Sequence, residues 1–379
     1  MPKEKSLDFL FLGPVYPLRG GIADTQEALG EKLTQQGYNV QMWSFSHLYP
    51  SFLFPGKSQY SVDKKTIGLT VHQKIHAYNP LHWNKIAKEI NSLKPKAVIF
   101  RYWTPFLAPV WVGIARKLSP TITRIGLVDN WVAHEPKPWD NLLTRYFEKK
   151  MHAFTTLSRS IKHQIEQTSE KEIWAGFHPI DSNLPHKIAQ PQARKLLKIT
   201  PKTRLVLFFG LIRPYKGLDL LLNAMALHPT LHLLIVGESY ESEKKYRAII
   251  DRKGLHKRVK WENRYVSIQE AAHFFSASDG VVLPYRKASQ SGVISLAYQY
   301  ETPLLVTDHD GIADPIRADQ TGVVCAPNEK AIAKGIGKLV DSDANTIFRK
   351  NLNQSKKNYS WEKYANDFSS FCLHEINQY

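Results

Sequence analysis

The chain has 379 residues, 43% of them hydrophobic and 22% charged, which predicts two or three globular domains with full cores. The formal net charge of +17 favours an anionic partner such as nucleic acid, an anionic membrane surface or a phosphorylated substrate. The lysines are scattered and no nucleic-acid signature is present, so we expect no nucleic-acid partner. Two cysteines, Cys325 and Cys372, exclude a disulfide scaffold and fit a reducing compartment. No apolar run approaches the roughly 20 residues of a membrane helix.

The first half alternates apolar runs with amphipathic segments, which predicts a parallel α/β sheet. Strands are predicted at Leu7–Gly13, Asn39–Phe45, Ala97–Phe100, Ile122–Val128, Ala153–Leu157 and Ile173–Ala175. Helices are predicted at Ala23–Gln36, His82–Leu93, Phe106–Leu118, Trp139–Met151 and Ser160–Gln167. Residues 46–66 are aromatic and proline-rich, and we expect a long functional or mobile loop there.

Two positions in the first half carry residues suited to a ligand. Gly20 and Gly21 precede the first helix, so they either permit a tight turn or let the backbone approach a ligand. Asp129 and His134 follow the strand at 122–128, and open α/β sheets bind ligands at such ends. Both are candidates for acid-base chemistry or sugar-hydroxyl contacts, while a helix cap and a structural histidine are the alternatives.

A proline-containing polar stretch near 185–200 predicts a domain boundary, after which strands and helices alternate again. Strands are predicted at Leu205–Phe209, Leu231–Val236, Val259–Trp261, Gly280–Leu283, Leu304–Thr307 and Val323–Cys325. Helices are predicted at Gln192–Leu197, then near 217–226, 242–253, 268–277, 292–300 and 329–340, with a last amphipathic helix from Ser360. The second half is therefore also predicted to hold a parallel sheet.

The turn after Leu205–Phe209 is the strongest candidate site. Gly210 ends the apolar run, Gly217 opens an amphipathic helix, and the cations Arg213 and Lys216 stand between them. A strand end, a glycine turn, a helix N-terminus and two cations are suited to a phosphate-bearing ligand. An ordinary strand-to-helix turn with solvated charges is the alternative.

Three further strand ends carry turns suited to a ligand. They are Gly237–Ser239, Asn263–Val266 and Pro284–Val293. The last turn is small, polar and glycine-containing before a helix, so its backbone N–H groups could hold phosphate oxygens. No cluster of Cys and His stands at metal-ligand spacing, so we expect no metal site.

These motifs resemble the retaining glycosyltransferases of family 4, whose GT-B fold has two facing Rossmann-like domains with an interdomain cleft. The likeness is carried by Leu207–Ala224, by Val282–Arg286 with Gln290–Val293, by Thr302–Thr307, and by Asp310–Ile316 with Gln320–Val324. In the first half, residues 13–23 and 129–135 are also similar to the family. The resemblance covers almost the whole chain.

The resemblance implies roles for individual residues. Arg213 and Lys216 would hold the donor diphosphate, and Gly20 and Gly21 would approach it from the first domain. The base would meet the backbone of Arg264, Tyr265 and Val266, while Ser291, Gly292 and Val293 would face phosphate or sugar. Gly210 and Gly237 belong to the donor-binding turns, and Asp129 stands where many relatives place a histidine near the donor sugar.

The sequence departs from the family at one important point. Most members carry two glutamates on the donor helix, and the corresponding positions here are near Ala288 and at Leu296. The chain resembles instead a subgroup with Gln-Ser-Gly at this turn. Gln290, Asp308 or Asp310 would then supply the ribose and sugar contacts.

The resemblance implies an N-terminal acceptor domain over 1–185, a nucleotide-sugar donor domain over 186–358, and a C-terminal helix over 359–379 that packs back toward the first domain. The expected function is transfer of a hexosyl group with retention from a UDP- or GDP-linked sugar to a glycan or lipid-linked acceptor, in polysaccharide or glycolipid synthesis. No tightly bound cofactor and no metal requirement are expected. A nucleotide-sugar epimerase and a non-catalytic sugar-nucleotide-binding subunit are the alternatives. The basic surface predicts a cytoplasmic protein, peripheral at the inner membrane face, with Arg145, Lys149, Lys150, Arg159 and Lys162 as contributors.

Overall fold

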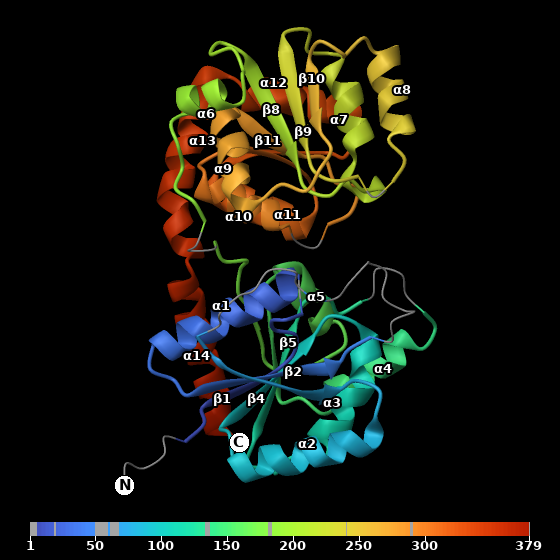
Figure 1. The fold of residues 1–379 in the computed structure, drawn as a ribbon, viewed down its shortest axis with the longest axis vertical. Coiled ribbons are helices and arrows are strands. Elements are labelled where there is room, and N and C mark those ends of the chain that lie inside the picture. The colour runs from blue at the N-terminus through green and yellow to red at the C-terminus, as the bar shows by residue number, and fades with distance from the viewer. Residues whose placement is uncertain are drawn as a thin grey trace. The chain divides into compact units, whose positions relative to one another are not determined.

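The computed structural model describes residues 6–18, 20–49, 60, 68–132, 137–180, 184–239, 241–288 and 291–378. It divides into two compact units (Figure 1). The first unit comprises Met1–Phe177 and Trp361–Tyr379, and the second comprises His178–Ser360. The chain therefore leaves the first unit once and returns to it through its last helix.

The first unit is built on a parallel sheet that has seven strands in the described part of the chain, in the order β3-β2-β1-β4-β5-β6-β7. Its strands are β1 (Phe9–Leu12), β2 (Val40–His47), β3 (Thr70–His76), β4 (Ala97–Tyr102), β5 (Thr123–Val128), β6 (Ala153–Thr156) and β7 (Ile173–Ala175). Its helices are α1 (Gly21–Gln35), α2 (Pro80–Leu93), η2 (Pro105–Leu107), α3 (Ala108–Ala115), α4 (Asp140–Glu148), α5 (Arg159–Glu166) and α14 (Trp361–Gln378).

The second unit contains a parallel sheet that has six strands among the residues described, in the order β10-β9-β8-β11-β12-β13. Its strands are β8 (Arg204–Phe209), β9 (Leu231–Val236), β10 (Val259–Glu262), β11 (Gly280–Leu283), β12 (Leu304–Thr307) and β13 (Gly322–Cys325). Its helices are α6 (Gln190–Leu196), η3 (Pro214–Lys216), α7 (Leu218–Met225), α8 (Lys244–Arg252), α9 (Ile268–Ala277), α10 (Gly292–Gln299), α11 (Asp310–Asp319), α12 (Glu329–Leu339), α13 (Ser342–Ser355) and η4 (Lys356–Tyr359).

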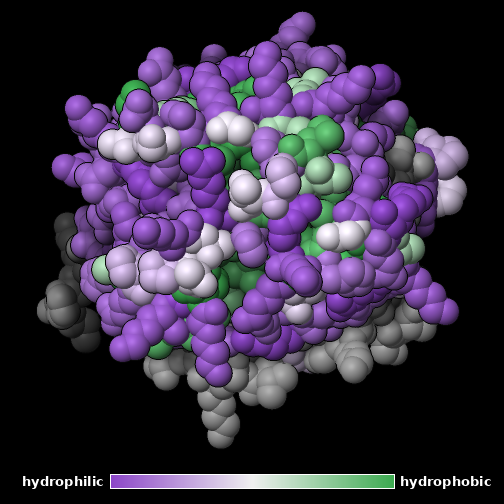
Figure 2. All heavy atoms as spheres, turned by 90° about the horizontal axis from the view of Figure 1, so that it is seen from above, coloured by the Kyte–Doolittle hydropathy of each residue, from purple (hydrophilic) through white to green (hydrophobic). Residues whose placement is uncertain are grey.

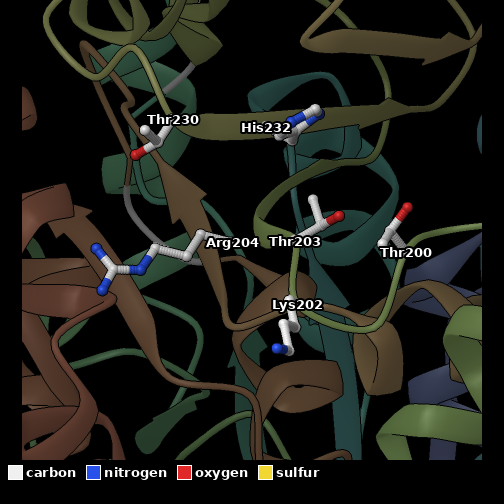
Figure 3. Close-up of a pocket in the computed structure, with 6 residues that line it drawn as sticks. All are labelled: Thr200, Lys202, Thr203, Arg204, Thr230 and His232. Atoms are coloured by element: carbon white, nitrogen blue, oxygen red, sulfur yellow. The ribbon is translucent and has the colours of Figure 1, made fainter.

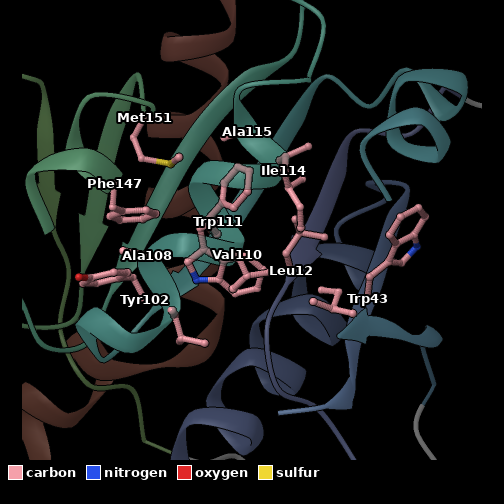
Figure 4. Close-up of a cluster of buried hydrophobic side chains, with 14 of the residues drawn as sticks. Leu12, Trp43, Tyr102, Ala108, Val110, Trp111, Ile114, Ala115, Phe147 and Met151 are labelled. Atoms are coloured by element: carbon pink, nitrogen blue, oxygen red, sulfur yellow. The ribbon is translucent and has the colours of Figure 1, made fainter. Parts of the chain in front are cut away.

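Central strands are mostly apolar because both sheet faces are covered. In β1, Leu10 and Leu12 belong to one core cluster, while Phe9 and Phe11 belong to another. The first cluster includes side chains of α2, α3 and α5, and Trp111 of α3 lies in the middle of it (Figure 4). The second cluster includes side chains of α1 and α14. The two-residue period of a strand thus sends alternate side chains into two helical layers.

The last helix, α14, is part of the first unit because its apolar face is buried there. Tyr364 and Phe368 lie in the same core cluster as Phe9 and Phe11, and the Phe368 ring stacks on Phe11 at 6.0 Å. The N-terminal end of α14 is also joined to α1, since the Lys32 ammonium lies 2.7 Å from the Glu362 carboxylate. A mostly hydrophilic surface covers the cores on the face that Figure 2 shows.

Among the strands and α-helices of the described residues, β3, α11 and α13 are absent from the sequence-based prediction. The edge strand β3 is only partly buried and α13 buries only Phe348 and Leu352, so both give a weak apolar signal. Helix α11 contains Pro315, a residue that argues against a helix interior. The predicted strands β9, β11 and β12 and the helix α9 are confirmed with their predicted bounds.

Candidate functional site

The strand order of the second sheet defines where a ligand would bind. β8 and β11 are neighbours, and the connections that leave them run toward opposite edges of the sheet. In open α/β sheets, ligands bind outside the carboxyl ends of strands at such a reversal. The residues that follow β8 and β11 are Gly210–Gly217 and Pro284–Ser291, which include the turn of Arg213 and Lys216.

Lys216 ends the short helix η3, and its side chain is buried with a relative exposure of 9%. Its Nζ atom lies 5.5 Å from the centre of the Tyr285 ring. Burial, assisted by the charge of Arg213, lowers the pKa of Lys216 from 10.5 to about 8. Within the described residues the ammonium group forms no ion pair and no hydrogen bond. A buried cation with no partner is energetically unfavourable unless an anion completes it.

Glycines shape the backbone around this lysine. A Cβ atom on Gly217, at φ +67°, would lie 2.0 Å from the Pro284 carbonyl oxygen, and one on Gly210, at φ +100°, would lie 3.0 Å from Lys216 Nζ. A Cβ atom on Gly237, at φ +144°, would lie 2.1 Å from the Gly210 carbonyl oxygen. The structure therefore gives Gly237 a packing role, because only glycine lets the ends of β8 and β9 approach this closely.

The loop after β11 is fixed against the loop after β8. The Arg286 guanidinium donates to both Asp219 carboxylate oxygens, at 2.8 and 2.7 Å, and to the Pro214 carbonyl oxygen at 3.0 Å. This pair holds the pKa of Asp219 below its usual value, against the effect of burial. The backbone N–H of Arg286 also donates to the Tyr215 carbonyl oxygen at 2.7 Å. The two loops that meet at the reversal are therefore preorganised.

The N-terminus of α10 lies on the same loop. Ser291 is its N-cap residue but makes no side-chain cap, and its hydroxyl lies 3.2 Å from the Tyr285 hydroxyl. A Cβ atom on Gly292 would meet nothing within 4 Å, and Val293 is buried in the core. The first backbone N–H groups of this helix thus have no side-chain acceptor from the N-cap residue, as an anion site requires.

The turn after β10 presents an aromatic ring to solvent. Tyr265 is exposed, Val266 is half-buried, and the Arg264 guanidinium lies 2.6 Å from the Glu270 carboxylate. Glu270 also completes a capping box with Ser267 at the start of α9. The Arg264 side chain is therefore engaged locally, whereas the Tyr265 ring is open to solvent.

Of the residues considered as replacements for the two glutamates, only the Asp308 side chain is described. The positions near Ala288 and at Leu296 correspond to the glutamates themselves. Asp308 follows β12 and lies 2.5 Å from the Arg317 guanidinium, while the half-buried Ala288 and Leu296 pack against the core. Gln290 lies outside the described residues. The side chain of Asp310 is likewise not described.

In the first unit the strand order reverses between β1 and β4, and the candidate residues follow β1 and β5. Gly20, at φ 122°, is the N-cap of α1 without a side-chain cap, and a Cβ atom on Gly20 or Gly21 would meet nothing within 4 Å. Asp129 is buried, and its two carboxylate oxygens accept hydrogen bonds from the Arg101 guanidinium at 2.6 Å each. Arg101 also donates to the Thr25 hydroxyl of α1 at 3.0 Å.

Two residues of the first unit, His134 and Arg101, differ in how the sequence analysis treated them. His134 lies outside the described residues, so its predicted role stays a prediction. Arg101 is a site residue that the sequence analysis did not identify. Its signal is an arginine within the otherwise apolar strand Ala97–Tyr102, since such a buried charge needs a partner.

A pocket of about 670 Å³ lies elsewhere in the second unit. It is lined by Thr200, Lys202, Thr203, Arg204, Thr230 and His232. Arg204 begins β8 and His232 lies near the start of β9, so the pocket is at the end of the sheet opposite Lys216. Figure 3 shows the Lys202 and Arg204 side chains pointing away from each other, so the two cations do not converge on one ligand.

No group of three or more His, Cys, Asp and Glu side chains could hold a metal ion within the part of the chain that the structure describes. In that same part, no helix is long and apolar enough to cross a membrane. Both cysteines are free thiols.

Comparison with solved structures identifies the architecture. Sucrose-phosphate synthase from Thermosynechococcus elongatus has a TM-score of 0.75 at 17% identity, covering 98% of this chain and 100% of that one. Anabaena Alr3699/HepE in complex with UDP has a TM-score of 0.75 at 15% identity, covering 97% and 100%. With its two parallel-sheet units, this protein has the GT-B fold.

The second unit carries the sequence signature of a family. Residues 189–359, which lie almost entirely in the second unit, match the family described as glycosyl transferases group 1. GDP-mannose:glycolipid 4-beta-D-mannosyltransferase of Xanthomonas campestris pv. campestris is 36% identical over 103 residues, which are 26% of this chain and 29% of that protein. D-inositol 3-phosphate glycosyltransferase of Mycolicibacterium gilvum is 27% identical over 177 residues, 45% of this chain and 39% of that protein. The chain thus spans less than half of each of these relatives.

Proposed function

We propose that this protein is a retaining glycosyltransferase that moves a hexosyl group from a nucleotide diphosphate sugar to a glycan or lipid-linked acceptor. The observation that carries the proposal is the buried side chain of Lys216, whose ammonium group has no ion-pair or hydrogen-bond partner among the described residues and lies beside the strand reversal of the second sheet. A diphosphate would supply the missing negative charge. Arg213, in the same turn, would add a second cation for the same group.

The proposed glycosyl transfer requires stabilisation of the diphosphate leaving group and uses no protein nucleophile. The bond between the anomeric carbon and the diphosphate oxygen breaks, and a bond from that carbon to the acceptor hydroxyl oxygen forms. The acceptor proton passes to a departing phosphate oxygen, and the nucleoside diphosphate leaves. Lys216 and Arg213 stabilise the charge that develops on this leaving group, and removing one such contact typically costs about 3 kcal/mol of barrier.

Donor recognition is proposed to use the same loops. The uncapped N-terminus of α10, with Ser291 and Gly292, would hold phosphate or sugar oxygens. The backbone of Arg264, Tyr265 and Val266 would meet the base. UDP and GDP both stay open as the nucleotide, because the Xanthomonas relative is named for GDP-mannose and the Anabaena neighbour for UDP.

The first unit is proposed to contribute a second anion-binding turn and a positioning carboxylate. Gly20 and Gly21 leave open space before the N-terminus of α1, which suits an anion. Asp129 is committed to Arg101 through both carboxylate oxygens, which favours a positioning role over direct attack on a substrate proton. An epimerase or a non-catalytic subunit is not favoured, because the named relatives are transferases.

The first experiment is a thermal-shift screen of UDP- and GDP-linked hexoses with the full chain, followed by transfer assays with the best binder. The matched pair of variants is Lys216→Ala and Lys202→Ala, which remove a lysine from opposite ends of the same sheet. We expect Lys216→Ala to abolish turnover and Lys202→Ala to leave it within twofold. Normal turnover in Lys216→Ala would refute the assignment.

Two further properties are proposed and tested with the same reagents. Retention is tested by the anomeric configuration of the product in NMR, which matters because the Xanthomonas relative is named for a beta product. Independence from metal is tested by dialysis against EDTA, after which we expect unchanged turnover. We also propose a cytoplasmic protein that meets a lipid-linked acceptor at an anionic membrane surface.

A further inference from the structure

Helix α4, taken together with its N-cap residue Trp139, carries large apolar side chains on its solvent face. Trp139, Leu142 and Tyr146 are 56%, 55% and 51% exposed. At 100° per residue, the three lie within about 60° of arc on the helix surface. The opposite side of the helix is buried, with Phe147 in the core and the Thr144 hydroxyl 2.9 Å from the Tyr102 hydroxyl. The exposed row is therefore not the core-facing side of the helix.

This arrangement is unusual in the molecule. Other exposed large apolar side chains are dispersed, for example Leu196 on α6 and Ile347 on α13. In the part of the chain that is described, no other helix bears three of them on one face. Single exposed apolar residues are ordinary, whereas a contiguous row indicates an interaction surface.

Cations adjoin the apolar row. By the same helical geometry Arg145 lies on one side of the row, and the exposed Lys149 and Lys150 directly follow the last residue of α4. Within the described residues none of these three forms an ion pair. In contrast, Lys162 on α5 has an i,i+4 partner, since its ammonium lies 3.6 Å from Glu166.

The acidic residues of α4 do not neutralise these cations. The Asp140 carboxylate accepts the backbone N–H of Lys137 at 2.9 Å, and the Glu148 carboxylate lies 3.2 Å from the Lys171 ammonium. No exposed position of α4 is acidic. The solvent face thus combines a tryptophan, a leucine and a tyrosine with uncompensated positive charge.

We propose that this face of α4 docks the protein on an anionic lipid bilayer, with the apolar row in the interfacial region and the cations against lipid phosphates. Trp and Tyr favour the bilayer interface because their rings are apolar at one end and polar at the other. Lysine and arginine beside an apolar face are attracted by anionic lipid. A protein partner for this face would need an acidic rim around an apolar centre. The experiment below distinguishes a protein partner from a lipid bilayer.

The docking face deepens the proposed function, because a lipid-linked acceptor would be met at the same surface. It is tested without donor or acceptor, by flotation of the full chain with vesicles of phosphatidylcholine alone and with 30% phosphatidylglycerol. We expect binding to the anionic vesicles, at least tenfold weaker binding to the neutral ones, and a marked loss at high salt. Absence of vesicle binding would not contradict glycosyl transfer, and absence of transfer would not contradict vesicle binding.

The variants decide whether α4 is responsible. Replacing Trp139, Leu142 and Tyr146 together by serine is expected to lower vesicle partitioning at least tenfold, and Leu196→Ser, an equally exposed leucine of the second unit, is the matched control. The Lys149→Ser, Lys150→Ser pair should weaken binding and flatten its salt dependence. A far-UV circular dichroism spectrum and a thermal transition like those of the wild type show that each variant is folded. The proposal is overturned if the wild type does not bind anionic vesicles, or if the α4 variants bind them as well as the wild type does. It is also overturned if light scattering shows that the wild type is a dimer and that the α4 variants are monomers.

Discussion

Replacing Lys216 by methionine is expected to stabilise the free protein while it removes donor binding. The Lys216 side chain is buried, and no anionic partner for its ammonium group lies in the described residues. Methionine keeps the apolar stem of the side chain and removes the charge. Stability and activity should therefore change in opposite directions, as expected where a group needed for ligand binding destabilises the free protein.

The magnitude follows from the pKa of Lys216, which burial and Arg213 lower from 10.5 to about 8. The difference of about 2.5, multiplied by 1.36 kcal/mol per pH unit, gives a cost of roughly 3 kcal/mol for the charged form in the folded state. The contact of Lys216 with the Tyr285 ring offsets about 1 kcal/mol of this. We therefore expect Lys216→Met to raise the free energy of unfolding by about 2 kcal/mol at pH 7.

The pH dependence gives the sign of the effect. Between pH 8 and 10.5 the unfolded state binds more protons at Lys216 than the folded state, so wild-type stability rises with pH in this window. Below pH 8 both states carry the charge, and the full cost is present. The advantage of Lys216→Met should thus fall by about 2 kcal/mol between pH 7 and pH 9.5.

Parallel thermal denaturation of the two proteins at pH 7 and pH 9.5 measures this difference. At pH 7 the transition of the second unit should lie several degrees higher in Lys216→Met, since about 1 kcal/mol corresponds to roughly 2–4 °C for a unit of this size. Lys202→Met, a change at an exposed lysine, is the control. An equal or lower transition temperature in Lys216→Met, at both pH values, would refute the reasoning.

Other predictions concern packing, the buried ion pair and the helix terminus. Gly237→Ala should cost about 3 kcal/mol of stability, because its Cβ would collide with the Gly210 carbonyl oxygen, and chemical denaturation measures this. Asp129→Ala should cost about 3–5 kcal/mol by leaving Arg101 buried and unpaired, and a double change of both residues to apolar ones should recover most of that loss in the same assay. Gly292→Ala should keep full stability, as its Cβ meets nothing within 4 Å, so any loss of nucleotide affinity in a calorimetric titration would report on the ligand itself.

Sequence patterns predict most of this fold because its central strands are buried on both faces. Runs such as Leu233–Val236 and Leu304–Val306 are apolar without interruption. The edge strand Thr70–His76 is half-exposed and carries polar residues on both faces, so no local pattern marks it. Its strand conformation depends on pairing with β2.

In the candidate site, features that are local in sequence could be predicted, whereas contacts between strands could not. The turn of Arg213 and Lys216 is local, and its glycines and cations are evident from the sequence. The partner of Asp129 is not local, because Arg101 stands 28 residues earlier on another strand. The packing role of Gly237 likewise depends on Gly210, on the neighbouring strand. Contacts across the sheet decide whether a residue is available to a ligand, and sequence spacing does not reveal them.

The most direct test of the diphosphate site is proton uptake on nucleotide binding. At pH 8.5 a lysine with a pKa of about 8 is mostly neutral, and an anion bound against it raises that pKa. Calorimetric titration of UDP or GDP into the full chain, in two buffers of different ionisation enthalpy, should show uptake of more than half a proton, and Lys216→Arg should show almost none. Tight nucleotide binding with no proton uptake in the wild type, and unchanged affinity in Lys216→Met, would place the diphosphate away from Lys216 and contradict the account.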